Sequence, residues 1–453
     1  MATKVIEDLL HEIYNESSPE PDELDESDLP DYINTLTDEC FLRLFNFLNK
    51  VDLTRCSMVC KRWNAVTKDK SLWRIVNFSP LQFNVDNDCF TTLAVSKMKY
   101  TQKIYLGSLR VTFKMLKSLA QHNKHLNTLI FGRGSTMEEV PTGREKIAFP
   151  KYLQTLDLRL ALGKFEFMNE LQRNFVYLRN LGVSSNCFDE THLQVFFSQL
   201  PALQTVDLTN CLQIDDLGVE VLANNCPCIK SLCLIGCRYV YGTTFDVLLD
   251  KCSNLRTLLL RYLKIEDDVI SQNIWSSSSI EELDISACPR LTWQGLFRLL
   301  VQLDHLVYLN MSYCGEGNAV NDTVLNEMTS LGNLRQLRML DIRWSFYITS
   351  EVLDAFLSKC SCLEYLGIYQ SFHIFSEHLA EVIPKLPSLK ILEFGASYPQ
   401  ELSLSNIIPQ LILTTRGLEV LSLINFTAVQ TNLVYKYLKT LIKKCSSLKR
   451  INF

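Results

Sequence analysis

The chain has 453 residues, of which 47% are hydrophobic and 21% charged, and this balance is typical of a soluble globular protein with room for two or three domains or for one small domain and a repeat array. No apolar run approaches the ~20 residues that cross a bilayer. There is no secretory signal, and the sixteen cysteines favour reduced thiols, so we expect a cytoplasmic and/or nuclear protein without membrane association.

The negative charge is concentrated in residues 1–32, which hold eleven acidic residues and one lysine, a net charge of −10. Low hydrophobicity and like charge predict a disordered acidic tail there. The remaining residues then carry a net charge of +5, which is too small an excess to indicate nucleic-acid binding.

A short helical region is predicted between Leu36 and Trp73. Apolar residues at helical spacing (i, i+3, i+4, i+7) predict one apolar helix face at Phe41, Leu44, Phe45 and Leu48. Asp52 is a candidate cap of a second helix, and Asp69 a candidate start of a short third turn. A unit of fewer than 40 residues buries a modest core, so we expect it to pack against a neighbouring domain or a partner.

Several short motifs of this region resemble an F-box: Leu-x-Asp-Glu from Leu36, Phe-x-x-Leu from Phe41, Cys-Ser-x-Val-Cys-Lys-Arg-Trp from Cys56, and Asp-x-Ser-Leu-Trp from Asp69. The resemblance covers about 40 residues, and Thr37 stands where that family usually has proline. It implies that the helices dock on a Skp-type adaptor and through it on a cullin scaffold, as in an SCF ubiquitin ligase. By this resemblance, the adaptor contacts and the core of the F-box are expected among eight residues, whose two roles the sequence does not separate: Leu36, Phe41, Leu44, Phe45, Leu48, Leu53, Val59 and Trp63.

After the F-box, a leucine-rich pattern repeats thirteen times between residue 126 and the last residue. A representative copy is Leu203-x-x-Val206-x-Leu208-x-x-Cys211, and most copies follow one another after 25–27 residues, which is the period of leucine-rich repeats. Each unit provides one short strand and one helix, such as the segment that starts at Asp216, and must stack on its neighbours to bury its apolar side. The alternation of a strand directs positions 4 and 6 of each copy inward and positions 3, 5 and 7 outward.

The cysteines follow the repeat and are predicted to be small buried residues instead of metal ligands. One repeat position is occupied by Cys211, Cys237, Cys288 and Cys314, and a second by Cys226, Cys252, Cys360 and Cys445. This pattern is similar to the cysteine-containing subclass of leucine-rich repeats. No nucleotide, hydrolase or metalloprotease motif is present. We therefore expect no metal, no cofactor and no catalysis; an enzyme would have to use an unphased cysteine, with candidates Cys89, Cys187, Cys228 and Cys362.

The outward strand positions are the candidate binding surface of the repeats. They bring together aromatic residues and arginines, which are the residue types that anchor protein interfaces. A ladder of acids runs beside them at Asp207, Asp284, Asp341 and Glu393. Cross-strand packing within the sheet is the alternative role of the aromatics. The candidate substrate-binding residues are Arg261, Tyr262, Tyr308, Tyr313, Arg343, Trp344, Tyr365 and Tyr369.

The predicted fold is an α/β chain with a tail (residues 1–32), a small helical F-box (33–80) and a right-handed leucine-rich-repeat solenoid (81–453), shaped like a horseshoe with parallel strands on its concave face and helices outside. Resemblance to F-box/leucine-rich-repeat proteins implies a non-catalytic substrate receptor of an SCF-type ubiquitin ligase, with an adaptor, a cullin and a protein substrate as partners. The alternative is a leucine-rich-repeat scaffold that binds the adaptor without an active ligase.

Overall fold

The computed structural model describes residues 32–79, 85–137, 149–162, 175–183, 196–331, 333–370, 381–395, 417–424 and 447–452. The predicted acidic tail, Cys187 and Cys445 lie outside the described residues. The chain divides into two compact units, Met1–Gly163 and Lys164–Phe453.

The first unit begins with short helices, and each start is determined by a local cap. Thr37, Asn49, Cys60 and Asp69 accept hydrogen bonds from backbone N–H groups of the helices that follow them. The predicted cap at Asp52 is wrong, because Asn49 caps that helix and Asp52 lies in its first turn. The helices are α2 (Tyr32–Thr35), α3 (Asp38–Asn46), α4 (Lys50–Cys56), α5 (Lys61–Val66) and the 3₁₀ turn η1 (Lys70–Trp73).

The same unit also contains the first strands of the repeat array. Thr101 Oγ1 donates to the carbonyl of Trp73 at 2.7 Å, so the end of the helical region is bonded to the segment before the second strand. One packing unit therefore contains both the F-box region and the first repeats. Its main parallel strands are β1 (Ile75–Asn77), β2 (Lys103–Tyr105), β4 (Thr128–Ile130) and β6 (Thr155–Asp157). A second parallel pair consists of β3 (Arg110–Val111) and β5 (Thr136–Met137). The helices of these repeats are α6 (Asn87–Ser96), η2 (Met98–Tyr100) and α7 (Phe113–His122).

The second unit is a ladder of parallel strands, each paired with the strand of the next repeat. The strands are β7 (Asn180–Gly182), β8 (Thr205–Asp207), β9 (Ser231–Cys233), β10 (Thr257–Leu259), β11 (Glu282–Asp284), β12 (Tyr308–Asn310), β13 (Met339–Asp341), β14 (Tyr365–Tyr369), β15 (Ile391–Gly395), β16 (Val420–Ile424) and β17 (Arg450–Asn452). Between them lie α9 (Asp216–Asn225), α10 (Phe245–Lys251), α11 (Asp267–Gln272), η7 (Trp275–Ser277), α12 (Trp293–Leu300), η8 (Cys314–Gly317), α13 (Asp322–Leu331), η9 (Asn333–Gln336), α14 (Ser350–Leu357) and η10 (Ile383–Lys385).

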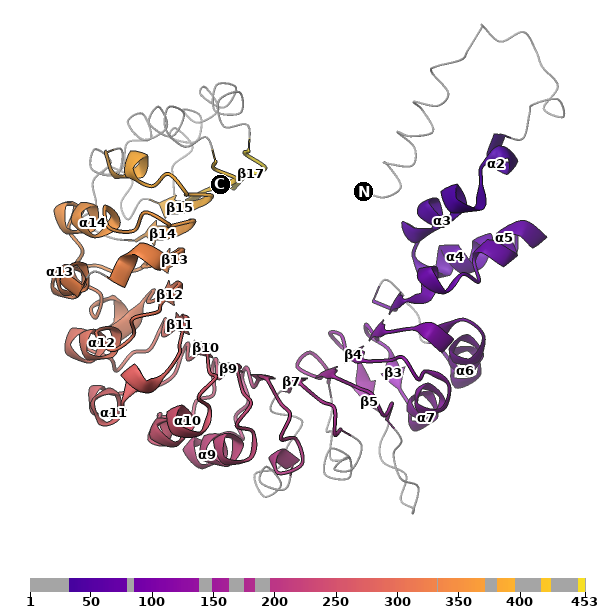
Figure 1. Cartoon of the computed structure of the whole chain (residues 1–453), viewed down its shortest axis with the longest axis horizontal. Helices are drawn as coiled ribbons and strands as arrows, with labels where there is room; N and C mark the ends of the chain where they lie inside the picture. The colour runs from indigo at the N-terminus through magenta and orange to yellow at the C-terminus, as the bar shows by residue number, and fades with distance from the viewer. Residues whose placement is uncertain are drawn as a thin grey trace, which may run out of the picture. The chain divides into compact units, whose positions relative to one another are not determined.

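Helices and strands of the second unit occupy opposite sides. Figure 1 shows α9 to α14 in sequence on the outer side, while β9 to β15 line the inner side of that unit, which we call its concave face. The parallel-strand leucine-rich-repeat fold predicted from the sequence is confirmed.

The predicted repeat register is also confirmed in the buried core. Equivalent residues pair across neighbouring strands, as Leu232 does with Val206 and with Leu258, and all three are fully buried. Seven of the eight phased cysteines are described, and all seven are buried free thiols: Cys211, Cys226, Cys237, Cys252, Cys288, Cys314 and Cys360. Among the described residues, no group of three or more His, Cys, Asp or Glu side chains is arranged to hold a metal ion.

A left-handed residue recurs after the strands of the second unit. The backbone φ is positive at seven successive copies of one position, eight residues into the repeat: Asn210, Gly236, Tyr262, Ala287, Tyr313, Trp344 and Gln370. Glycine and asparagine adopt this conformation readily, whereas a bulky side chain does so at a cost. The three aromatic members are therefore held in a backbone conformation that local preference opposes.

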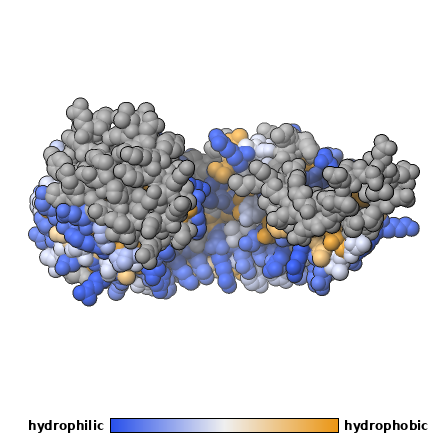
Figure 2. All heavy atoms as spheres, turned by 90° about the horizontal axis from the view of Figure 1, so that it is seen from above, coloured by the Kyte–Doolittle hydropathy of each residue, from blue (hydrophilic) through white to orange (hydrophobic). Residues whose placement is uncertain are grey.

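The surface is predominantly polar. In the view of Figure 2, hydrophilic residues cover most of the described surface, and hydrophobic residues appear among them in small groups. No helix in the described ranges has the length and apolar character required of a membrane span.

Candidate protein-interaction surfaces

An aromatic cluster forms the core of the F-box region. Phe41 and Phe45 of α3 lie with their ring centroids 5.5 Å apart, and both rings pack against Trp63 of α5, at 5.4 and 5.3 Å. The Arg62 guanidinium covers the Phe41 ring at 5.0 Å and pairs with Asp38 at 2.9 Å. The cluster joins α3 to α5, which are separated in the chain by α4 and its two short connections, residues 47–49 and 57–60.

This core divides the eight residues that the sequence grouped together. Phe41, Phe45 and Leu53 are buried within the chain itself, so they support the helices and are not available to a partner. Leu44 and Val59 are exposed. The remaining three, Leu36, Leu48 and Trp63, are half-buried.

Further exposed apolar residues of this region were missed by the sequence reasoning, among them Phe47 and Met58. The exposed fraction is 67% for Phe47, just after α3, and 75% for Met58, in the turn after α4; for Leu44 and Val59 it is 38% and 63%. Phe47 does not belong to the apolar helix face of Phe41, Leu44, Phe45 and Leu48. The sequence could therefore have indicated that Phe47 lies outside the core. These four side chains form what we call the exposed apolar set of the F-box.

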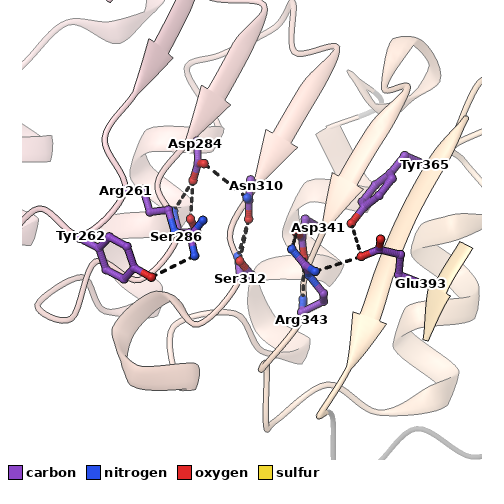
Figure 3. Close-up of polar contacts among 10 residues, drawn as sticks. All are labelled: Arg261, Tyr262, Asp284, Ser286, Asn310, Ser312, Asp341, Arg343, Tyr365 and Glu393. Carbon is purple, nitrogen blue, oxygen red and sulfur yellow. Dashed lines mark hydrogen bonds and ion pairs between the residues drawn. The ribbon is translucent and has the colours of Figure 1, made fainter. Parts of the chain in front are cut away.

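An ion-pair network occupies the concave face around β13. Arg343 binds Asp341 through Nε and Nη2, at 2.7 and 2.5 Å, and its Nη1 reaches Glu393 at 3.0 Å (Figure 3). The hydroxyl of Tyr365 donates to the same Glu393 carboxylate at 2.9 Å. Strands β13, β14 and β15 are thereby linked by side chains as well as by their backbones.

A second polar group lies beside it on β10 to β12. Asp284 accepts hydrogen bonds from the backbone and hydroxyl of Ser286, and Asn310 binds Ser312 in the same manner. Arg261 stacks on Tyr262, with its guanidinium carbon 4.7 Å from the ring centroid, and Nη2 donates to the Tyr262 hydroxyl at 3.0 Å (Figure 3). No carboxylate within the described ranges is in ion-pair distance of Arg261, although its charge opposes the rise in the pKa of Asp284.

Three aromatic side chains form a row next to these networks. The Trp344 ring meets Tyr313 and Tyr369 edge to face, with centroids 6.1 Å apart in each case. Arg343 also packs over Tyr369, at 5.3 Å. Tyr313 and Trp344 are 43% and 38% exposed despite these contacts. Part of the row therefore packs within the sheet, and part of it faces solvent.

Burial governs the titration of the polar groups on this face. Desolvation raises the pKa values of the Asp284 and Asp341 carboxyls, and hydrogen bonds from Ser286 and from Arg343, respectively, oppose the change. Burial likewise raises the pKa values of the Tyr308 and Tyr365 hydroxyls. The predicted residues on β12 to β14 thus lie in one partly desolvated environment.

The structure does not favour the phased cysteines as nucleophiles. Burial raises the pKa to about 12 for Cys237 and Cys288 and to about 11 for Cys252. The thiolate is the reactive form, and at these pKa values it is scarcely populated near neutral pH. Three of the unphased candidates, Cys89, Cys228 and Cys362, are exposed.

Comparison with known proteins supports the F-box assignment of the helices in the first unit. Residues 33–79 match the F-box-like family model. A stretch of 42 residues is 48% identical to the F-box/LRR-repeat protein 5 of Danio rerio, and it spans 9% of this chain and 6% of that protein's length.

Solved structures resemble the fold over most of the chain. A chain from the crystal structure of the Rad7 and Elc1 complex in yeast superposes with a TM-score of 0.56 and 15% identity, covering 88% of this chain and 92% of the other. A leucine-rich-repeat protein of Leptospira interrogans gives a TM-score of 0.44 at 17% identity, with coverage of 85% and 97%. At these identities, the first likeness concerns the fold alone.

Proposed function

We propose that this chain, an F-box protein with leucine-rich repeats, is the substrate-recognition subunit of an SCF-type ubiquitin ligase. In this proposal the F-box binds a Skp-type adaptor, the adaptor connects to a cullin, and the concave face of the repeats binds the protein to be ubiquitinated.

The observation that carries the proposal is the exposed apolar set on an F-box-like domain. Phe41, Phe45 and Trp63 already fill the interior of the helices, while Leu44, Phe47, Met58 and Val59 remain exposed. Exposed apolar groups of this kind mark interaction sites. The yeast structure that shares the fold is also of a two-protein complex.

The substrate surface is proposed on the concave face because it offers aromatic and arginine anchors. Trp344 and Tyr313 are exposed and pack on each other, and the exposed Tyr262 stacks on Arg261, so little conformational entropy is lost when a partner covers them. The chain then performs no covalent step: it raises the effective concentration of the substrate near the enzyme that transfers ubiquitin.

Affinity purification of the full chain tests the adaptor half of the proposal. We expect Leu44→Lys combined with Phe47→Lys to lose the adaptor and the cullin, because two charges would enter an apolar interface. Lysine suits this site because a positive charge at the C-terminal end of α3 is favourable, so the fold is preserved. An unchanged melting temperature would confirm that binding, not folding, is lost.

A second variant tests the substrate half in the same purification with the proteasome inhibited. Trp344→Ala combined with Tyr313→Ala should retain the adaptor and the cullin while other co-purified proteins disappear. If the intact chain binds the adaptor and no cullin, the ligase proposal fails and a binding scaffold remains. If the lysine variant still binds the adaptor, the exposed apolar set is not the docking surface.

A further inference from the structure

The first unit contains a cavity that the proposed function does not use. It has a volume of about 550 Å³ and lies where α4 of the F-box meets β1 and α6. Cavities that bind small molecules typically measure roughly 300–1,000 Å³. The space is therefore adequate for a small organic ligand.

Most of the cavity wall is apolar. The lining includes Val51 of α4, Trp73, Val76 and Phe78 around β1, and Leu93 and Met98 around α6. Trp73, Val76 and Met98 are at most 2% exposed and belong to the packed core behind the wall, whereas Val51 and Leu93 are half-buried and offer the apolar surface that a ligand can cover. An apolar ligand body would gain from leaving water for such a wall.

One charge on the wall is uncompensated. Arg55 pairs with Asp52 at 2.9 Å, and Asn49 also donates to Asp52, at 2.6 Å, so these polar groups satisfy one another. Lys50 is different: its Nζ donates to the carbonyl of Leu72 at 2.5 Å and lies 5.7 Å from the Trp73 ring centroid. Among the described residues it has no carboxylate partner.

The Lys50 ammonium retains capacity for a ligand. An ammonium carries three N–H groups, and the contact with Leu72 uses one. Burial lowers the pKa of Lys50, which means that the surroundings disfavour its charge and do not supply a compensating anion. A bound anion would provide that compensation through charge-assisted hydrogen bonds.

We propose that this cavity binds an amphiphilic monocarboxylate of the fatty-acid kind, with its chain against the accessible Val51 and Leu93 side chains and its carboxylate on Lys50. A single ammonium matches a single negative charge. A phosphate dianion would need a second free cation, and Arg55 is already paired with Asp52. The concave enclosure favours a free small molecule over a lipid that remains in a bilayer.

Calorimetric titration of the intact full chain with sodium dodecanoate, below its micelle concentration, tests the proposal. We expect saturable one-to-one binding, and at least tenfold weaker binding of dodecanol, which has the same chain without the charge. Lys50→Gln should weaken dodecanoate binding at least tenfold, which corresponds to ~1.4 kcal/mol.

Lys97→Gln is the matched control. Its ammonium also lies 5.7 Å from the Trp73 ring and burial also lowers its pKa, but Lys97 is not part of the cavity wall. This variant should bind dodecanoate within twofold of the intact chain. Equal losses in the two lysine variants would overturn the proposal, because they would indicate a general charge effect.

A space-filling variant provides a test that does not depend on charge. Cys89 is exposed and borders the cavity from α6, so Cys89→Trp should fill the space without disturbing the core. We expect it to abolish dodecanoate binding while the circular dichroism spectrum is retained. Absence of dodecanoate binding to the intact chain, or undiminished binding to Cys89→Trp, would overturn the proposal.

Discussion

Replacing Arg343 by methionine should locally destabilise the strands around β13. The substitution removes two bonds to Asp341 and one to Glu393, while the methionine keeps much of the apolar stem. Asp341 is 1% exposed in its side chain, so its carboxylate would remain buried without its cation. Glu393 would keep the Tyr365 hydroxyl as a partner.

The magnitude follows from how deeply the pair is buried. Breaking a fully buried ion pair by removing one partner costs 3–5 kcal/mol, and Arg343 is 26% exposed, so we expect about 2–3 kcal/mol. Replacing Asp341 by asparagine in the same chain should recover part of this loss, because no buried charge then remains.

The loss should also depend on pH. Burial already raises the pKa of Asp341 above its ordinary value of 3.8, with Arg343 opposing the change, and removal of Arg343 should raise it further. A carboxyl with a raised folded-state pKa binds more protons folded than unfolded, so its destabilising effect is full above that pKa and shrinks as the pH falls through it. The variant should therefore be closer to the parent chain in mildly acidic buffer than at neutral pH.

Hydrogen–deuterium exchange measures this effect strand by strand. In Arg343→Met, amides of β13 should exchange roughly thirtyfold faster or more, since each 1.4 kcal/mol is a factor of ten. Arg338→Met is the matched control, because Arg338 pairs with Glu364 at 3.2 Å and is 64% exposed, and surface pairs contribute ~0–1 kcal/mol. Equal exchange in the two variants, or an effect independent of pH, would refute the reasoning.

Two further predictions concern thiols and turns. A thiol reagent should modify the exposed Cys228 and Cys362 in the native chain but leave Cys288 unmodified until the chain unfolds, because burial raises the pKa of Cys288 to about 12. Mass spectrometry of labelled peptides checks this, and early labelling of Cys288 would contradict it. Gly236→Ala should lower the free energy of unfolding by about 1–3 kcal/mol, because φ is +71° there and the new Cβ would lie 2.3 Å from Asn210 Oδ1. The melting temperature should fall accordingly, and an unchanged melting temperature would contradict this prediction.

The repeats could be predicted from the sequence because one period determines many residues at once. Leu258 and Leu260 are buried and Leu259 between them is only half-buried, as the alternation of a strand requires. The cysteine phase was equally informative: Cys226 and Cys252 both lie in the core at the same repeat position. The period also indicated which residues lie on the outward side of the strands.

The F-box shows where such reasoning ends. Leu44 and Phe45 are adjacent, both apolar and both compatible with one helical face, yet Phe45 is buried against Trp63 and Leu44 is exposed. Which of them contacts the interior depends on the crossing of α3 with α5, and spacing within α3 carries no information about that crossing. The cap at Asn49 was missed because Asn49 and Asp52 are both good capping residues, and the sequence does not show at which of them the helix begins.

Side-chain networks across strands were anticipated only in outline. The sequence placed acids next to Arg261 and Arg343 without indicating that, among the residues the structure describes, Arg343 forms ion pairs and Arg261 forms none. The left-handed position had a visible signal, since Asn210 and Gly236 occupy it in two copies, but Trp344 at the same position conceals that signal.

The parallel ladder of the second unit affects how its binding specificity can change during evolution. Each strand pairs only with the strands of the adjacent repeats, as β9 does with β8 and β10. In such an array, a substitution is felt mainly by its immediate neighbours, and stability is close to a sum of local terms. Outward residues can therefore be exchanged one repeat at a time, so related chains can acquire different partners gradually while each intermediate remains folded.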